Sequence, residues 1–157
     1  MNARIKDIMT RDVECASAEM TVREAAERMK SRNIGSLPVC DGKKVIGVIT
    51  DRDITIRSTA GGADPNSTKV GDVMSRDIVS VKPGDSLRDA ERIMHDRQLR
   101  RLPVVDDNGE LVGYLAIAKI ARKESPAQAG RVLQGVSQPT TPQSLAEIAV
   151  RKGSARS

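Results

Sequence analysis

The chain has 157 residues, which fits one compact domain or two small units that share a core. It contains no Phe or Trp and only one Tyr, Tyr114, so the core must be built from aliphatic side chains, and aromatic platforms for stacking bases are nearly absent. The formal net charge of +5 lies mostly in residues 122–157, where six Lys and Arg face two acidic residues. This composition argues against single-stranded nucleic-acid binding, with nonspecific binding by the basic C-terminal part as a weaker alternative.

Targeting segments and reactive side chains add little to the prediction of function. No N-terminal stretch resembles a signal peptide and no apolar run reaches the roughly 18 residues of a membrane span, so we expect a cytoplasmic protein with no membrane partner. Cys15 and Cys40 are typical of small core residues in a reducing compartment, with a disulfide or metal pair as the alternative. The one histidine, His95, has no recognisable nucleophile or metal-ligand set around it in sequence, so we expect no catalysis.

The sequence contains an internal repeat with a spacing of 65 residues. When residues 5–39 are placed over residues 70–104 without a gap, 11 of 35 positions are identical, among them the Leu-Pro-Val that ends each segment. After a one-residue insertion, Val45-Ile46-Gly47 lies over Leu111-Val112-Gly113. The chain is therefore a duplication of one supersecondary unit.

Each copy begins with a short lead, followed by a strand and a helix. The leads are residues 5–9 and 70–74, and small strands are predicted near residues 13–15 and 78–81. The first helix of each copy opens on a capping box, Thr21 with Glu24 and Ser86 with Asp89. Apolar residues then recur at helical spacing, which predicts one buried face.

A hairpin and a second helix complete each copy. Leu37-Pro38-Val39 and Leu102-Pro103-Val104 begin strands, and turn residues then lead to the strands 45–49 and 111–115. Second helices are predicted from about Asp51 and Ile117. The fold class is thus α/β, with two β-α-β-β-α units. The predicted organisation is 5–58 for the first unit, 59–69 for a linker, 70–122 for the second unit, and 123–157 for a disordered basic tail.

The order of these motifs, present twice, resembles the cystathionine β-synthase (CBS) domain family. The resemblance covers about residues 5–122 and is most specific at Val48-Ile49-Thr50-Asp51-Arg52-Asp53-Ile54; the chain looks like a short stand-alone bacterial CBS pair. It implies that the two units pack as a pseudo-two-fold pair with two clefts between them, and that such pairs dimerise into a disc. It further implies an adenosine-containing ligand such as AMP, ADP, ATP or S-adenosylmethionine. It also implies regulation of a partner protein, which the sequence does not identify.

Thr50 and Asp53 are the first candidates for ligand binding. A carboxylate at the start of a helix can accept hydrogen bonds from both hydroxyls of a ribose, and Asp53 stands three residues after Thr50. Thr50 would supply a hydroxyl, and the free N–H groups of the helix start would favour a nearby phosphate. The alternative is that the two side chains only cap the helix.

The remaining candidates come from the segment before the first hairpin and from its counterpart. Ile34, Gly35, Ser36 and Pro38 match the family's second binding segment, in which a small residue lets the ligand approach; a tight turn at a strand entry is the alternative. The backbone near Val13 should face the base, by resemblance.

The second copy differs at the positions that matter for a ligand. Arg100 and Arg101 align with Gly35 and Ser36, and their guanidinium groups suit a phosphate, unless they are only solvated or paired with carboxylates. Ala116 and Lys119 replace Thr50 and Asp53, and neither can accept a hydrogen bond from a ribose diol. We therefore expect one adenosine site per chain, with the second cleft empty or taking another ligand.

Two functions follow from the sequence. The leading hypothesis is a nucleotide-sensing regulatory module, with a homodimer as its assembly. The alternative is a ligand-independent scaffold that acts through dimerisation and its basic C-terminal part.

Overall fold

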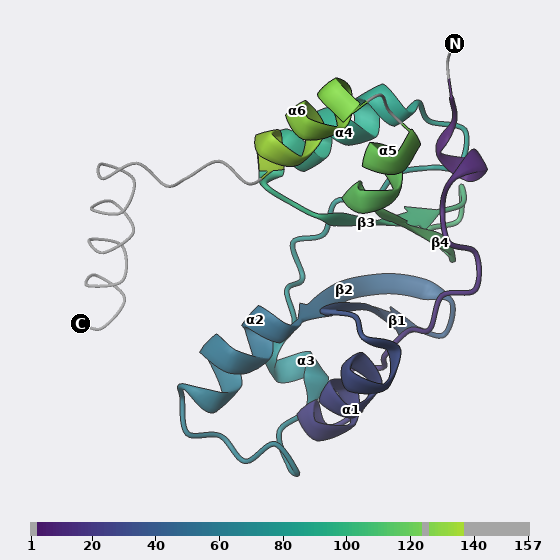
Figure 1. Ribbon diagram of the computed structural model, residues 1–157. Helices are drawn as coiled ribbons and strands as arrows, with labels where there is room; N and C mark the ends of the chain where they lie inside the picture. Colours follow the sequence, from purple (N-terminus) through teal and green to yellow (C-terminus); the bar gives the residue numbers. More distant parts are fainter. Residues whose placement is uncertain (1–2, 124–125, 137–157) are drawn as a thin grey trace.

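The computed structural model describes residues 3–123 and 126–136 (Figure 1). Its first half contains the elements η1 (Ile5–Asp7), α1 (Val22–Arg32), β1 (Ser36–Asp41), β2 (Lys44–Thr50), α2 (Asp51–Asp53), the π-helical η2 (Ile54–Thr59) and α3 (Val70–Val73). Its second half contains α4 (Leu87–Arg97), β3 (Arg101–Val105), β4 (Leu111–Ala116), α5 (Ile117–Lys123) and α6 (Pro126–Val136).

The two predicted hairpins form two separate two-stranded antiparallel sheets, β1–β2 and β3–β4. They pair in matching registers, with Pro38 opposite Val48 in one and Pro103 opposite Tyr114 in the other. The two sheets lie next to each other between the helices of the two halves (Figure 1). Their turns touch, because the Leu111 amide donates to the Lys43 carbonyl at 2.8 Å. The repeat of the sequence is therefore a repeat of structure.

The long helices α1 and α4 begin and end in the same way. The side chain of Thr21 accepts a hydrogen bond from the Glu24 amide, and that of Ser86 accepts one from the Asp89 amide, as the capping pattern predicts. Each helix ends on a left-handed residue, Asn33 or Gln98, both with φ of 54°. These two residues occupy equivalent places in the repeat.

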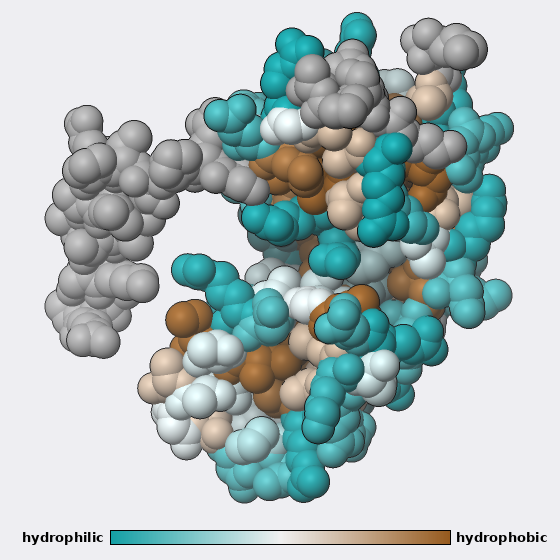
Figure 2. All heavy atoms as spheres, viewed as in Figure 1, coloured by the Kyte–Doolittle hydropathy of each residue, from teal (hydrophilic) through white to brown (hydrophobic). Residues whose placement is uncertain are grey.

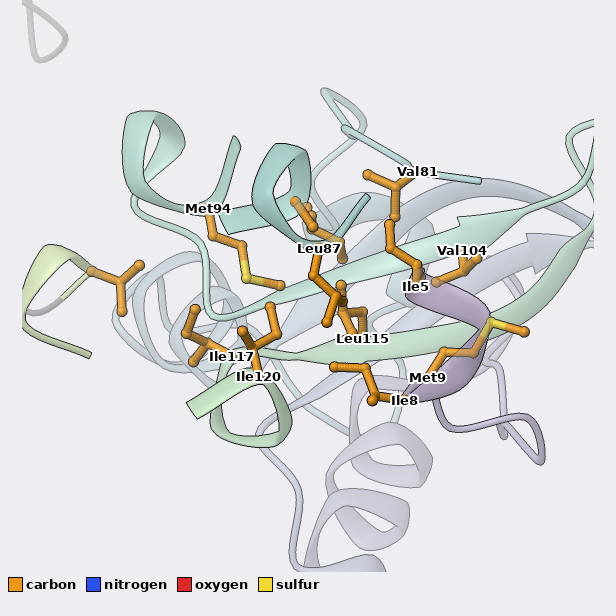
Figure 3. Packing of buried hydrophobic residues seen from close by; sticks show 13 residues of the cluster. Ile5, Ile8, Met9, Val81, Leu87, Met94, Val104, Leu115, Ile117 and Ile120 are labelled. Atoms are coloured by element: carbon orange, nitrogen blue, oxygen red, sulfur yellow. The ribbon is translucent and has the colours of Figure 1, made fainter. Parts of the chain in front are cut away.

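The leads of the two copies are exchanged between the two hydrophobic cores. Ile5, Ile8 and Met9 pack with the second copy's core, where Leu115 and Val104 are fully buried (Figure 3). Conversely, α3 and Met74 pack with the first copy's core. Each hydrophobic core therefore contains the lead of the other copy, so the structural units do not coincide with the sequence repeats.

Backbone pairing holds each exchanged lead in place. Ser75 pairs with Val48 of β2 through two hydrogen bonds of 2.9 and 3.0 Å, and Thr10 pairs with Tyr114 of β4 in the same way. A Cβ at Gly47 would lie 2.7 Å from the Ser75 carbonyl oxygen, so this crossing requires glycine. Gly113 occupies the equivalent crossing, where a Cβ would lie 2.6 Å from the Met9 sulfur.

The predicted small strands are reduced to single bridges, Ala16 to Val39 and Val81 to Val104. The Ala16 amide donates to the Pro38 carbonyl and its carbonyl accepts from the Cys40 amide. The preceding rung would need an N–H from Pro38, which has none, so the ladder stops after one pair. The strands predicted near 13–15 and 78–81 are therefore present as one-residue parallel bridges, at Ala16 and at Val81.

The expected disorder from residue 123 onward does not hold for residues 126–136, which form α6. Val132 and Val136 are one helical turn apart and pack on the second copy's core, and Val136 is buried. The Gln98 amide nitrogen also donates to the Gly135 carbonyl at 2.9 Å. The two valines and this hydrogen bond hold the helix on the second copy's core, which composition alone does not reveal. Residues 137–157 lie outside the described part of the chain.

Candidate ligand-binding clefts

Two cavities lie between the copies and are related by the repeat. The first, here called the Thr50 cleft, has a volume of about 480 Å³, and the second, here called the Lys119 cleft, has a volume of about 390 Å³. Most positions of one have the repeat-equivalent residue in the other, such as Ile78 and Val13, Leu99 and Ile34, or Pro103 and Pro38. Both volumes are in the range of small-molecule sites.

The Thr50 cleft combines an apolar wall with polar groups from both copies. Its apolar lining residues include Val48, Ile78, Val79, Leu99 and Pro103, and its polar ones include Ser36, Thr50, Asp51, Arg52, Ser75, Asp77, Gln98, Arg100 and Arg101. Gly35 also lines it, and a Cβ there would lie 3.0 Å from the Asp51 carboxylate, which explains the small residue. This lining fits a ligand with an apolar face and a charged end.

Thr50 and Asp53 form a reciprocal cap at the start of α2. The Asp53 amide donates to Thr50 Oγ1 at 3.0 Å, and the Thr50 amide donates to Asp53 Oδ2 at 3.0 Å. Asp53 is 8% exposed and does not line the cleft. Its Oδ1 accepts a long hydrogen bond of 3.4 Å from Ser75 Oγ, and the Arg57 Nε lies 3.9 Å from it. Because Ser75 does line the cleft, the Asp53 carboxylate lies directly behind its wall.

The Lys119 cleft is lined by residues that follow the first copy's lead and by residues at the end of the second copy's hairpin. Val13, Ile34, Leu37 and Pro38 form its apolar side, and Ala116 and Lys119 stand at the positions that Thr50 and Asp53 occupy in the first copy. Lys119 Nζ donates to Thr10 Oγ1 at 2.6 Å. This cleft therefore has a different polar surface.

A shared wall separates the two clefts. Ser36, Arg101 and Tyr114 line both of them. The hydroxyl groups of Ser36 and Tyr114 share a hydrogen bond of 2.9 Å. Burial raises the pKa of Tyr114 above its usual value, against the opposing effects of the Ser36 hydrogen bond and the Arg101 charge, so this phenol is neutral at ordinary pH.

The structure divides the predicted site residues between the two clefts. Thr50, Gly35 and Arg100 line the Thr50 cleft, whereas Val13, Ile34 and Pro38 line the Lys119 cleft. Ser36 and Arg101 line both, and Asp53 lies behind the wall. Sequence reasoning joined Val13 to Thr50 because both belong to one copy.

The residues that sequence reasoning missed are Ile78, Val79, Leu99 and Pro103 of the Thr50 cleft, together with Tyr114. The first four are the repeat equivalents of Val13, Glu14, Ile34 and Pro38, so the alignment of the two copies contained the signal. The exchange of the leads decides which copy supplies them.

Within residues 3–123 and 126–136, no group of three or more His, Cys, Asp or Glu side chains is arranged to hold a metal ion. No helix in the same ranges has the length and apolar character needed to cross a membrane. Cys40 is buried and the half-buried Cys15 is its neighbour; both thiols are free.

Sequence comparisons identify close relatives across most of the chain. The CBS domain model matches residues 5–58 and 70–125. The CBS domain-containing protein YhcV of Bacillus subtilis is 43% identical over 134 residues, which cover 85% of this chain and 94% of the relative. Hypoxic response protein 1 of Mycobacterium tuberculosis is 37% identical over 118 residues, which cover 74% of this chain and 82% of the relative.

Solved structures give the same result. A crystal structure of hypoxic response protein I with two coordinated zinc ions has a TM-score of 0.72 at 35% identity, covering 78% of this chain and 100% of the other. The CBS domain pair of MJ0100, in complex with 5-methylthioadenosine and S-adenosyl-L-methionine, has a TM-score of 0.70 at 26% identity, covering 78% of this chain and 96% of the other. CBSX2 in complex with AMP has a TM-score of 0.67 at 26% identity, covering 81% and 98%.

The predicted fold class is confirmed: with two matches to the family model on two structurally equivalent units, the chain belongs to the CBS domain family and is built as a CBS pair.

Proposed function

We propose that this CBS pair is a regulatory module that binds an adenosine-containing ligand in the Thr50 cleft and signals its presence to a partner protein. The observation that carries the proposal is the lining of that cleft, in which apolar residues of the second copy line the same cavity as Thr50 and Arg101. Base, sugar and phosphate each require one of these surfaces.

The base would lie against Ile78, Leu99 and Pro103. These side chains present aliphatic surface without charge, and an adenine ring buries apolar area against them. The main-chain groups around Ile78 would read the edge of the base. In this arrangement Ile78 takes the role that the sequence assigned to Val13.

The phosphate or other charged end would lie near Arg100 and Arg101, with the Thr50 hydroxyl as a further donor. Arg101 is half-buried, and within residues 3–123 and 126–136 its guanidinium forms no hydrogen bond or ion pair. A partly buried cation without a partner gains more from a bound anion than a solvated one does.

The ribose would be bound by Asp53, whose carboxylate lies behind Ser75 in the cleft wall. The Asp53 Oδ1 atom accepts only the 3.4 Å hydrogen bond from Ser75, so a sugar hydroxyl that displaces the Ser75 hydroxyl would gain a charged acceptor. The structures of MJ0100 with S-adenosyl-L-methionine and CBSX2 with AMP support ligands of this class. Assembly as a homodimer and a purely regulatory, non-catalytic role are part of the same proposal.

The test is a thermal-shift screen of AMP, ADP, ATP, S-adenosylmethionine and NADH, followed by calorimetry of those that stabilise the chain. A ligand at 100 times its Kd adds about 2.7 kcal/mol to the free energy of unfolding, which raises Tm by roughly 5–10 °C for a chain of this size. We expect one site per chain. If no adenosine compound shifts Tm, the proposal is wrong.

Variants identify the cleft. Asp53→Asn keeps an oxygen that can accept from the Thr50 amide but removes the charge, so it should weaken the adenosine ligand by at least about tenfold. Lys119→Ala, which changes only the other cleft, is the matched control and should leave the affinity within about twofold. If Asp53→Asn binds the adenosine ligand with unchanged affinity, the proposed contact between Asp53 and the ribose is wrong.

A further inference from the structure

The Lys119 cleft differs from the Thr50 cleft in the charges that face it. Four cationic side chains and two carboxylates line it: Arg32, Arg101, Lys119, Arg122, Asp12 and Glu14. The two clefts share a scaffold, so this difference lies in the side chains alone. The Lys119 cleft thus carries one more positive charge than the Thr50 cleft, whose charged lining residues are Arg52, Arg100, Arg101, Asp51 and Asp77.

One of its carboxylates is already neutralised from inside the protein. Glu14 Oε2 lies 2.9 Å from Arg32 Nε, and Glu14 Oε1 lies 3.4 Å from Arg28 Nη1. Both oxygens of Glu14 are thus occupied by guanidinium groups. Arg101, Lys119 and Arg122 then face only the exposed Asp12, so the cleft keeps an excess of positive charge.

The Lys119 side chain is oriented by Thr10, which follows the lead of the first copy. Its ammonium group donates one hydrogen bond to Thr10 Oγ1 at 2.6 Å, and Thr10 also lines the cleft. An ammonium has three donors, so two remain for a ligand. Thr10 fixes the position of the charge without cancelling it, because a hydroxyl is neutral.

The positions that would recognise a sugar are missing. Ala116 has no hydroxyl where the other cleft has Thr50, and Lys119 has no acceptor where the other copy has Asp53. A ligand of this cleft therefore gains most from its negative charge and little from a ribose. Three cations around one cavity suit an anion that carries several charges over a short length.

We propose that the Lys119 cleft binds a compact, multiply charged phosphate anion, of which inorganic pyrophosphate is the simplest example. Lys119 is the principal contact, Arg101 reaches the same anion from the wall shared with the Thr50 cleft, and Arg122 contributes from the rim. The proposal does not depend on an adenosine ligand in the Thr50 cleft.

The test is calorimetric titration of the full chain with sodium pyrophosphate at constant ionic strength, with the emission of Tyr114 as a second readout because it lines the same cleft and is the chain's only aromatic residue. We expect one pyrophosphate per chain. Lys119→Ala should weaken it by at least about tenfold, since it removes a charged donor.

Three control variants separate the site from general effects of charge. Lys30→Ala makes the same charge change at an exposed residue of α1 that does not line the cleft, and it should leave the pyrophosphate affinity within about twofold. Thr10→Val removes the partner of Lys119 but keeps its charge, so binding should persist. Thr50→Ala should leave pyrophosphate binding intact while it weakens an adenosine ligand.

The proposal is overturned if millimolar pyrophosphate gives no binding heat, or if Lys119→Ala and Lys30→Ala weaken binding equally. It is also overturned if sodium sulfate at the same ionic strength raises Tm as much as pyrophosphate does. Loss of pyrophosphate binding in Thr50→Ala would place the anion in the other cleft. Since adenosine compounds are titrated separately, failure of this proposal and failure of the proposed function give different results.

Discussion

Ser36 and Tyr114 are 78 residues apart in sequence, yet their hydroxyl groups share a hydrogen bond of 2.9 Å in the wall between the two clefts. One residue comes from the start of β1 and the other from β4, so this contact joins the two copies. A ligand in either cleft would therefore border the same hydrogen-bonded pair. This wall lies inside the molecule, whereas on the face shown in Figure 2 hydrophilic residues predominate and hydrophobic residues appear in patches.

The first prediction concerns this hydrogen bond. Tyr114→Phe leaves the Ser36 hydroxyl, 7% exposed, without its partner, so the free energy of unfolding should fall by about 1–3 kcal/mol. Urea denaturation followed by circular dichroism measures the change. In the double variant Tyr114→Phe/Ser36→Ala much of the loss should be recovered, because no buried hydroxyl remains unsatisfied; a purely additive double variant would contradict this explanation.

The second prediction concerns the crossing of the leads over the strands. Gly47→Ala places a Cβ 2.7 Å from the backbone oxygen of Ser75, which cannot move away without breaking the pairing with Val48. We expect a loss of about 1–3 kcal/mol, measured by urea denaturation. Gly84→Ala is the matched control, because nothing lies within 4 Å of its Cβ, and it should be neutral or slightly stabilising. Equal behaviour of the two variants would refute the steric argument.

The third prediction is a loss of stability at alkaline pH. Burial, together with a hydrogen bond to Cys15 and its charge, raises the pKa of Cys40 from 9.0 to about 12. Because the folded pKa is the higher one, the unfolded chain holds fewer protons above pH 9, and the free energy of unfolding falls as the pH rises from 9 towards 12. Below pH 9 this contribution is fully present.

Cys40→Ala tests that prediction, because it removes the titrating thiol. The free energy of unfolding, measured between pH 8 and about pH 11, should fall less steeply in the variant than in the unmodified chain. Tyr114 also has a raised pKa and remains in both proteins, so its effect cancels in the comparison. Identical pH profiles would show that the Cys40 thiol ionises alike in the folded and unfolded chain.

Much of the fold could be predicted because it follows from local patterns that occur twice. The caps at Thr21 and Ser86 and the two hairpins are short-range features, and their agreement between the copies made them reliable. The exchange of the leads could not be predicted in this way. Ile5 and Val70 are equally apolar, and only three-dimensional packing decides which core receives which lead.

The sequence predicted several residues of the candidate site correctly, but it did not predict which of them line the same cleft. Thr50 and Arg101 were identified from residue chemistry and alignment, and both line the same cleft. Val13 was assigned to that cleft, but the crossing at Gly47 brings Ile78 there instead. Burial of Asp53 behind Ser75 was also beyond sequence reasoning, since the motif alone does not distinguish a capping carboxylate from a ligand contact.

The fourth prediction reverses the divergence between the two clefts. Ala116→Thr/Lys119→Asp restores the residue pair of the first copy in the Lys119 cleft, where Val13, Ile34 and Pro38 already provide the equivalent apolar wall. If the Thr50 and Asp53 types determine adenosine binding, calorimetry should give two adenosine sites per chain in the double variant and one in the unmodified chain. The same substitutions remove the Lys119 charge and should abolish pyrophosphate binding. Two equivalent adenosine sites in the unmodified chain would show that this pair does not control ligand choice.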